Sequence, residues 1–269
     1  MIHSRYERIL EKSRPFVISY EKNIEQFNLN PLNLIMVEPL DCLRSESTHM
    51  FDLLVKLDHF TFGDQGMASE KWVFLDCGAI PGAIFGLSVE AKELPPEYRL
   101  GVDDGQVPIS FYIGIPTYMD KGWFGHNLSS LNRSLPSEHR FNGLGVLTKA
   151  LAMSCFGVKA FYGATQWNSS AIHIHSQLAD MELLSGYTPN HTYPNSFVYR
   201  SQYSDEKMLR ALDGKRRLAE RADLYHPSGN ENANLELHGK ILNGERFILC
   251  GRPELRGGKM FHPMKRLRC

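Results

Sequence analysis

A glycine-rich turn that runs directly into an apolar helix constrains this chain more than any other feature. The turn is Arg140-Phe141-Asn142-Gly143-Leu144-Gly145, and the mainly apolar run Val146 to Met153 follows without a break. The first N–H groups of a helix have no partner inside the helix and lie at the positive end of its dipole. Glycines let a ligand approach such a backbone closely. The sequence therefore predicts an anion site, typically for a phosphate, at this turn.

Composition limits the classes of protein to which the chain can belong. With 269 residues, 42% hydrophobic and 22% charged, the chain has the make-up of a globular protein with a proper core. Lys plus Arg equals Asp plus Glu at 30 each, so charge gives no reason to expect a nucleic-acid or membrane partner. Five cysteines without a CxxC pair favour neither disulfides nor a thiol zinc site. Because no secretory signal or bilayer-spanning run is found, we expect a cytoplasmic protein.

The spacing of apolar residues predicts a chain of mixed helices and strands. Predicted strands cover 32–37, 71–75, 82–89, 107–115, 123–135, 158–164, 181–187 and 196–200. Predicted helices cover 45–60, 146–156, 171–179 and 205–224. A slip in the apolar alternation between Leu128 and Leu131 indicates a bulge.

Three domains are predicted along the chain. They are a helical lead-in over 1–30, a main domain over 31–201 and a C-terminal extension over 202–269. The extension is expected to hold a helix, a flexible loop over 226–234 and a hairpin over 235–252 that turns at Asn243-Gly244.

The glycine turn stands in a specific order with two neighbouring motifs. A predicted strand ends at Leu135-Pro136 just before it, and Asn168-x-x-Ala171 opens the helix after the next strand. This order resembles the GNAT superfamily of acyl-CoA-dependent N-acyltransferases. Arg140, Gly143 and Gly145 match the family's pyrophosphate loop, Gln/Arg-x-x-Gly-x-Gly/Ala, and Asn168 and Ala171 match its next motif. The tyrosine that the family has seven residues after that Asn is replaced here by His175.

The resemblance implies a fold, a co-substrate and a set of binding residues. The implied fold is α/β (α+β), a GNAT-type mixed, largely antiparallel sheet flanked by helices, with a C-terminal helix and β-hairpin extension. The implied co-substrate is acetyl-CoA or another acyl-CoA, with its pyrophosphate on the backbone of the turn. The residues expected to bind it are Leu135, Arg140, Phe141, Asn142, Gly143, Leu144, Gly145, Val146, Asn168 and Ala171.

The resemblance also implies direct acyl transfer to an amine of a small molecule or protein, within a ternary complex. The backbone N–H of Leu135 is expected to polarise the thioester carbonyl, and Ser134 lies at the strand end that the acceptor reaches. His175 is the expected acid for the leaving thiolate, because an imidazole has a pKa of about 6.5. The candidates for the base are His126, Asn132 and Ser134, with Glu138 and His139 nearby, and none stands out.

Several alternatives stay open at this stage. The donor can be a longer-chain or carrier-protein thioester, as the replacement by His175 and the long segment 91–124 suggest. The chain can also be a binding or assembly module that catalyses weakly. A metal site at His173, His175 and His191 is disfavoured, because residues two apart on a helix face different ways. A dinucleotide-binding fold is disfavoured because no acidic residue follows at the required distance. The oligomeric state is open, with a homodimer as one option.

Overall fold

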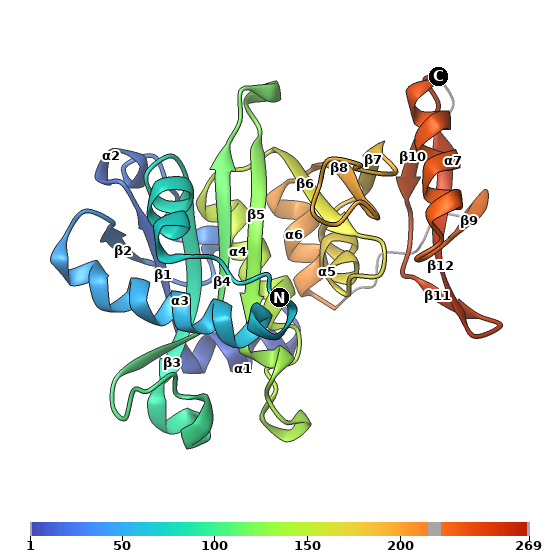
Figure 1. Cartoon of the computed structure of the whole chain (residues 1–269). Coiled ribbons are helices and arrows are strands. Elements are labelled where there is room, and N and C mark those ends of the chain that lie inside the picture. The colour runs from blue at the N-terminus through green and yellow to red at the C-terminus, as the bar shows by residue number, and fades with distance from the viewer. Residues whose placement is uncertain (1, 215–221, 268–269) are drawn as a thin grey trace. The chain divides into compact units, whose positions relative to one another are not determined.

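The computed structural model describes residues 2–214 and 222–267 (Figure 1). The chain divides into two compact units, Met1–Val158 and Lys159–Cys269, which are described separately below. This division falls inside the predicted 31–201 domain and does not follow the predicted boundaries at 30/31 and 201/202. In the described part of the chain, no helix has both the length and the apolar composition needed to cross a bilayer.

The first unit is built on a five-stranded sheet. Its elements are α1 (Ser4–Lys12), β1 (Ser13–Ser19), α2 (Glu21–Ile24), β2 (Glu38–Asp41), α3 (Thr48–Phe62), β3 (Ala83–Glu90), β4 (Gln106–Pro116), β5 (Trp123–Ser130) and α4 (Leu144–Cys155). The strand order is β2-β1-β3-β4-β5. β1 and β2 are parallel, and the other neighbours are antiparallel. The sheet is therefore mixed and largely antiparallel, as predicted.

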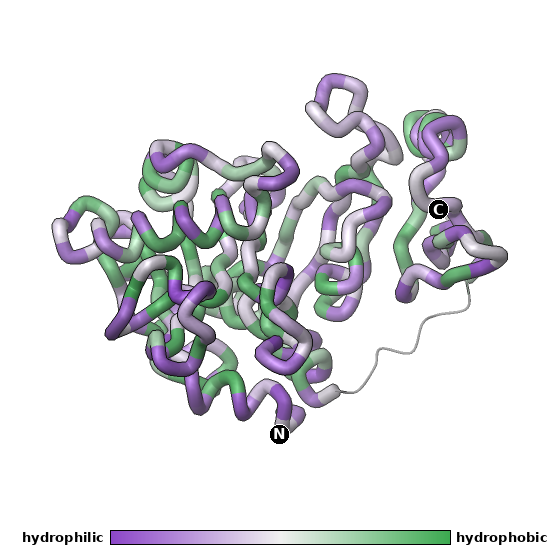
Figure 2. The backbone as a smooth tube through the Cα atoms, turned by 60° about the horizontal axis from the view of Figure 1, so that its bottom comes forward, coloured by the Kyte–Doolittle hydropathy of each residue, from purple (hydrophilic) through white to green (hydrophobic). Residues whose placement is uncertain are grey.

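Helices α3 and α4 cover opposite faces of this sheet. Asn127 and Ser129 of β5 hydrogen-bond to Asp58 of α3. Tyr112 of β4 is the cross-strand partner of Leu128 of β5. The centre of its ring lies 5.6 Å from the Nζ of Lys149 on α4. Because successive strand residues point to opposite faces, the two helices lie on different sides. In Figure 2, hydrophobic and hydrophilic stretches alternate along the backbone. α3 buries one face, whereas α4 is buried on nearly all sides.

Asp58 is a fully buried carboxylate at the centre of this packing. Its Oδ1 accepts hydrogen bonds from Asn127 Nδ2 and Ser129 Oγ, both at 2.6 Å. Its Oδ2 accepts the backbone N–H of Ser69 at 2.7 Å. Three donors therefore compensate the cost of burying the charge and connect α3, β5 and the segment after α3.

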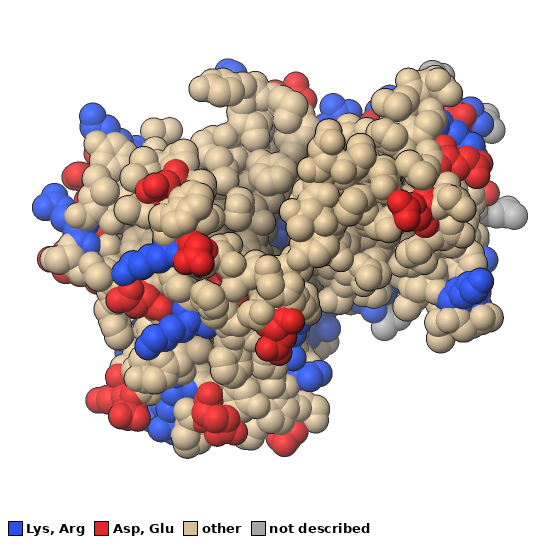
Figure 3. All heavy atoms as spheres, viewed as in Figure 1, with Lys and Arg blue, Asp and Glu red and all other residues tan. Residues whose placement is uncertain are grey.

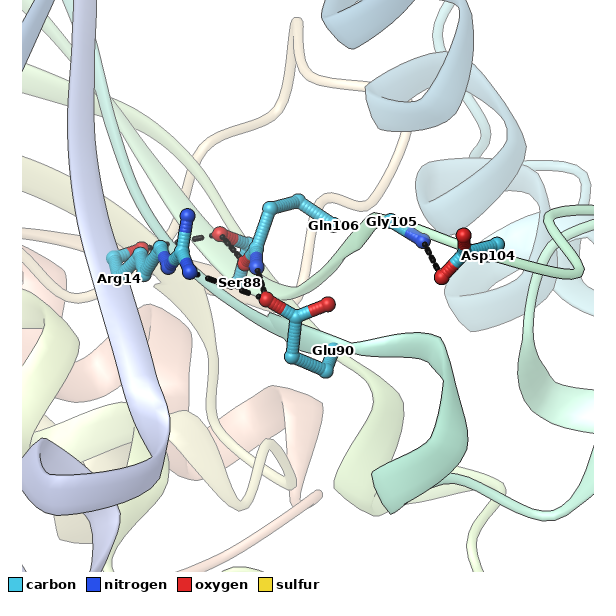
Figure 4. A network of polar contacts seen from close by, with 6 residues as sticks. All are labelled: Arg14, Ser88, Glu90, Asp104, Gly105 and Gln106. Atoms are coloured by element: carbon cyan, nitrogen blue, oxygen red, sulfur yellow. Dashed lines mark hydrogen bonds and ion pairs between the residues drawn. The ribbon is translucent and has the colours of Figure 1, made fainter.

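A polar network joins β1, β3 and β4 at one end of the sheet (Figure 4). The hydroxyl of Ser88 lies 3.0 Å from the carbonyl oxygen of Arg14 and 2.9 Å from Oε1 of Gln106. The Nε2 of Gln106 donates to Glu90 at 2.6 Å, and Arg14 forms an ion pair with Glu90 at 3.1 Å. On the face drawn in Figure 3, Lys and Arg side chains are interspersed with Asp and Glu.

The second unit contains an antiparallel sheet, three helices and a terminal hairpin. Its elements are β6 (Ala160–Gln166), α5 (Ala171–Leu178), β7 (Met181–Ser185), β8 (Ser196–Gln202), α6 (Asp205–Leu212), β9 (Leu224–Pro227), α7 (Glu231–Leu242), β10 (Arg246–Leu249), β11 (Glu254–Arg256) and β12 (Lys259–Leu267). The strand order is β6-β8-β7-β10-β12, and both β11 and β9 pair with β12. The unit contains a C-terminal helix, α7, and a hairpin of β11 and β12, but at other positions than the predicted helix over 205–224 and the predicted hairpin over 235–252.

The core of the second unit holds two buried histidines around Trp167. His226 and His262 are cross-strand partners on β9 and β12, and their rings lie 4.4 and 5.3 Å from the Trp167 ring. His226 Nε2 lies 2.7 Å from Oδ1 of Asn234, and His262 Nε2 lies 2.8 Å from the carbonyl oxygen of Trp167. Burial lowers the pKa of both imidazoles, that of His262 from 6.5 to about 4. Both are therefore held neutral at pH 7.

We expect acid to destabilise the second unit through His262. Below pH 6.5 the unfolded chain binds a proton that the folded imidazole, with a pKa of about 4, does not. The free energy of unfolding therefore falls as the pH falls, by roughly 3 kcal/mol between pH 6.5 and 4. Urea unfolding followed by Trp167 fluorescence, with the other two tryptophans changed to phenylalanine, measures this loss. His262→Phe should flatten the pH dependence, whereas the exposed His191→Gln should not; equal curves would contradict the assignment.

Three predictions for the first unit are wrong. The lead-in over 1–30 is not only helical, because β1 lies within it and pairs with β2 and β3. The predicted strand over 32–37 is replaced by a 3-10 turn, Pro31–Asn33, with β2 starting at Glu38. The predicted strand over 71–75 is helical and enters a π-helix, Val73–Ala79. Short apolar runs of this kind fit a strand or a buried turn equally well.

The long strand predicted over 123–135 is shorter than expected. It ends at Ser130, and a 3-10 turn, Leu131–Arg133, follows. The bulge lies at His126, because Asn127 pairs with Ile113 and Gly125 with the next residue of β4. The slip in alternation after Leu128 therefore marks the strand end.

The predictions for the C-terminal extension are also partly wrong. The segment 226–252 is not a loop and a hairpin, because α7 occupies Glu231–Leu242. Asn243-Gly244 ends this helix, with Gly244 at φ 89°, and a left-handed glycine is also a common helix stop. The helix predicted over 205–224 ends at Leu212, and Leu224 begins β9. The remainder of that prediction, over 215–221, lies outside the described residues.

Candidate functional site

The glycine turn enters α4 through a left-handed residue. Gly143 has φ 93° and ψ 5° and directly precedes the first helical residue, Leu144. The N–H of Leu144 donates to the carbonyl of Phe141, and that of Leu147 donates to Gly143, both at 3.0 Å. This conformation favours glycine, because a Cβ would crowd the following carbonyl oxygen.

Four backbone amides at this turn make no hydrogen bond within the described part of the chain. Within residues 2–214 and 222–267, no acceptor takes the N–H of Asn142, Gly143, Gly145 or Val146. They lie in the first turn and the entry of a helix of 12 residues, at the positive end of its dipole. The predicted donors Phe141 and Leu144 are already engaged, the first with Asn132 and the second with Phe141. The prediction of an anion site therefore applies to four of the six amides between 141 and 146.

Asn132 clamps the start of the turn. Its Nδ2 donates to the carbonyl of Phe141 at 2.7 Å, and its Oδ1 accepts the Phe141 N–H at 2.8 Å. The Nε of Arg140 donates to the carbonyl of Leu135 at 2.8 Å, which leaves its exposed guanidinium end for other partners. The turn is therefore fixed by side chains before any ligand binds, and Asn132 serves as its clamp.

The N-terminal helix packs against the turn from the same unit. A Cβ at Gly143 would lie 2.6 Å from Cε1 of Tyr6, which is fully buried. Gly143 is therefore required both by its backbone conformation and by the Tyr6 ring. Sequence reasoning missed this contact because Tyr6 stands far away in the chain, in a segment with a weak helical pattern.

The strand end before the turn differs from its predicted role. The N–H of Leu135 donates to the carbonyl of Leu131 at 2.9 Å, as does the N–H of Ser134. The hydroxyl of Ser134 lies 3.4 Å from the carbonyl oxygen of Phe60. The N–H of Leu135, predicted to polarise a thioester, is therefore occupied by a local turn in this conformation.

The remaining base candidates differ in their ionisation. His126 is exposed, but the protein around it partly removes water from the imidazole, which lowers its pKa against the charge of Asp58 and keeps it neutral at pH 7. The pKa of Glu138 is lowered, first by its own backbone N–H and then by the Ser137 hydroxyl, so this exposed carboxylate is a weak base. Asn132 is committed to the turn. We take His126, which lies at the β5 bulge, as the candidate that accepts a proton.

The other predicted site residues belong to the second unit. Asn168 is exposed, and the hydroxyl of Ser169 accepts the N–H of Ala171 at 3.1 Å, at the start of α5. His175 is buried in α5, with its ring 5.5 Å from that of Tyr199. Burial raises the pKa of Tyr199 well above 10, so its phenol stays protonated. The roles of Asn168, Ala171 and His175 at a co-substrate stay predictions. Among the described residues, no three His, Cys, Asp or Glu side chains are arranged to hold a metal ion.

Comparisons with known proteins give similarity only at the level of solved structures. No protein-family model and no curated protein matches the sequence. A similar structure is the ribosomal-protein-S18-alanine N-acetyltransferase from Escherichia coli, with 13% identity over 58% of this chain and 90% of that chain and a TM-score of 0.40. The aminoglycoside 6'-acetyltransferase type Ii has 16% identity over 58% and 90%, with a TM-score of 0.38. The NatC complex bound to Gag peptide and CoA has 16% identity over 62% and 97%, with a TM-score of 0.40. The first two of these structures are acetyltransferases by their names.

Proposed function

We propose that this chain is an acyltransferase that moves an acyl group, most simply acetyl, from coenzyme A to an amine. The observation that carries the proposal is the turn at 140–145. Four amides at the entry of α4 have no acceptor among the residues that the structure describes, Gly143 is left-handed, and Asn132 fixes the turn in advance. A preorganised set of N–H groups at a helix start suits a pyrophosphate, because the ligand does not have to order the loop.

The chain's own residues fit the diphosphate of coenzyme A. The amides of Asn142, Gly143, Gly145 and Val146 would hold its oxygens, and the free end of the Arg140 guanidinium would add charge-assisted bonds. The thioester itself supplies the reactive carbonyl, and the protein supplies binding and orientation.

The proposed reaction is direct transfer in a ternary complex. The amine attacks the thioester carbonyl, a C–N bond forms, the C–S bond breaks, and the thiolate leaves with the electron pair. His126 is the proposed acceptor of the amine proton, because its lowered pKa keeps it neutral at pH 7. His175 is the proposed donor of a proton to the thiolate, as the resemblance implies.

One observation favours a second candidate, a module that binds coenzyme A but catalyses weakly. The N–H of Leu135, the predicted donor to the thioester carbonyl, is engaged with Leu131 at 2.9 Å. Without a donor at this point, the transition state would lose a contribution of several kcal/mol. Either the turn at 131–135 opens when acyl-coenzyme A binds, or the chain binds coenzyme A without fast turnover.

A turnover experiment separates these candidates. The protein is incubated with acetyl-CoA and a mixed panel of small amines and N-terminal peptides, with free thiol and product mass as readouts. An acetyltransferase should release thiol in step with an acetylated amine. Gly143→Asp should abolish both, because its side chain has no room beside the Tyr6 ring and its left-handed backbone is strained, so that the amides of the turn are displaced. Binding of coenzyme A without any product from the panel would favour the module. Product formed equally well by Gly143→Asp would contradict the proposal.

A further inference from the structure

The N-terminal helix brings a second guanidinium to the glycine turn. Tyr6 of α1 lies against Gly143, and Arg5 is tied to that tyrosine. The NH2 of Arg5 donates to the Tyr6 hydroxyl at 2.8 Å, and the guanidinium carbon lies 4.5 Å from the centre of the Tyr6 ring. The Arg5 head group is therefore one hydrogen bond away from the ring that touches the turn.

The Arg5 guanidinium keeps one donor without an acceptor in the described part of the chain. Its Nε is buried, and no described residue accepts a hydrogen bond from it. A buried guanidinium donor without an acceptor is costly, so its presence calls for a partner such as a bound ion or ligand. Among the described residues, the ion pairs of α1 and β1 are those of Lys12 with Glu93 and of Arg14 with Glu90, and neither uses Arg5.

We propose that Arg5 is a phosphate-binding residue of the donor site, and that the donor is therefore free coenzyme A. This inference rests on the proposed function. Arg140 and the four amides without an acceptor belong to the turn, and Arg5 is joined to it through Tyr6, all within one unit. Coenzyme A brings a diphosphate and a 3′-phosphate to such a site, whereas a carrier-bound phosphopantetheine brings one phosphodiester. Two guanidiniums suit the several phosphate charges of coenzyme A and are more than the single phosphodiester of a carrier-bound phosphopantetheine requires.

The inference also gives α1 a role beyond packing. Tyr6 fixes the turn through Gly143 and holds Arg5 through its hydroxyl, so one residue positions both parts of the anion site. In this assignment Arg5 binds the ligand, and Tyr6 is a positioning residue.

The test compares ligands that differ only in their phosphates. Isothermal titration of the full chain uses coenzyme A, dephospho-coenzyme A, 4′-phosphopantetheine and pantetheine. Arg5→Met keeps the side-chain volume and removes the charge, and Arg8→Met is the matched control, because Arg8 is exposed on the same helix. Arg5→Met should weaken coenzyme A binding about ten-fold, as for one lost charge-assisted bond, and leave pantetheine unchanged. Arg8→Met should stay within about two-fold of the wild type, as expected for an exposed charge.

Distinct outcomes overturn the inference and the proposed function. If the wild type binds coenzyme A and Arg5→Met binds it as tightly as Arg8→Met does, the assignment of Arg5 fails alone. If Arg5→Met weakens pantetheine as much as coenzyme A, Arg5 acts on the fold and not on a phosphate. If the wild type binds neither coenzyme A nor acetyl-CoA and yields no product, the proposed function fails. Tyr6→Phe, which keeps the ring and removes the hydroxyl, gives an independent arm and should weaken coenzyme A but not pantetheine.

Discussion

Gly143→Ala should destabilise the first unit by about 3 kcal/mol, from the sum of left-handed strain and overpacking. The residue has φ 93°, and its new Cβ would lie 2.6 Å from Cε1 of the buried Tyr6. Because the same shift displaces the free amides of the turn, coenzyme A binding should weaken by about ten-fold or more. Urea unfolding and isothermal titration measure the two effects on one protein sample.

Two control variants separate the causes of this loss. Gly105 has φ 101° with nothing near its would-be Cβ, so Gly105→Ala carries the strain alone and should cost about 1–2 kcal/mol. Tyr6→Ala in the Gly143→Ala background makes room for the Cβ and should recover part of the added cost, which a double-mutant cycle reports. If Gly143→Ala and Gly105→Ala cost the same, the Tyr6 ring does not limit the turn.

Asp58→Ala should cost the first unit about 3 kcal/mol or more, because it leaves buried donors without an acceptor. The donors are the side chains of Asn127 and Ser129 and the backbone N–H of Ser69. The loss should appear as a lower urea midpoint with an unchanged slope.

The matched control for this change lies on the same helix. Asp52 of α3 pairs with Lys71 at the surface, where both side chains are about half exposed. Asp52→Ala should cost less than about 1 kcal/mol, since exposed ion pairs contribute little. Equal losses from the two variants would contradict the account of Asp58 as a buried junction.

Part of the fold is predictable because its pattern is strong locally. The strand over 82–89 and the helix over 146–156 have long apolar runs closed by clear stops, and both are present as β3 and α4. The antiparallel pair over 181–187 and 196–200 is likewise present as β7 and β8. In these segments, local sequence and tertiary packing favour the same structure.

The errors fall where one pattern serves two structures. Asn243-Gly244 is typical of a hairpin turn and also of a helix end, and here it ends α7. The segment 71–75 is apolar enough for a strand, yet it enters the π-helix Val73–Ala79, of which Phe74 is buried against Phe111. Only contacts with distant residues decide between such alternatives.

The backbone turn of the candidate site can be predicted from the sequence, but the side-chain contacts that hold the turn in place cannot. The glycine spacing indicates the turn, because a left-handed residue at a helix start has a local signature. The clamp by Asn132 and the contacts of Arg5 and Tyr6 have none, since they depend on how β5 ends and where α1 packs. The sequence reads as one strand up to Leu135, and on that basis the N–H of Leu135 is predicted to contact the thioester. The 3-10 turn at Leu131–Arg133 interrupts the strand, and the N–H of Leu135 donates to Leu131 instead.

The most direct test of the central claim is isothermal titration of the wild-type chain with coenzyme A and acetyl-CoA at low salt. The amides of Gly143, Gly145 and Val146 and the guanidinium of Arg140 are expected to bind the diphosphate of either ligand. The account predicts one site per chain that saturates below millimolar ligand and is weakened by Gly143→Ala. No binding of either ligand at millimolar concentration would contradict it.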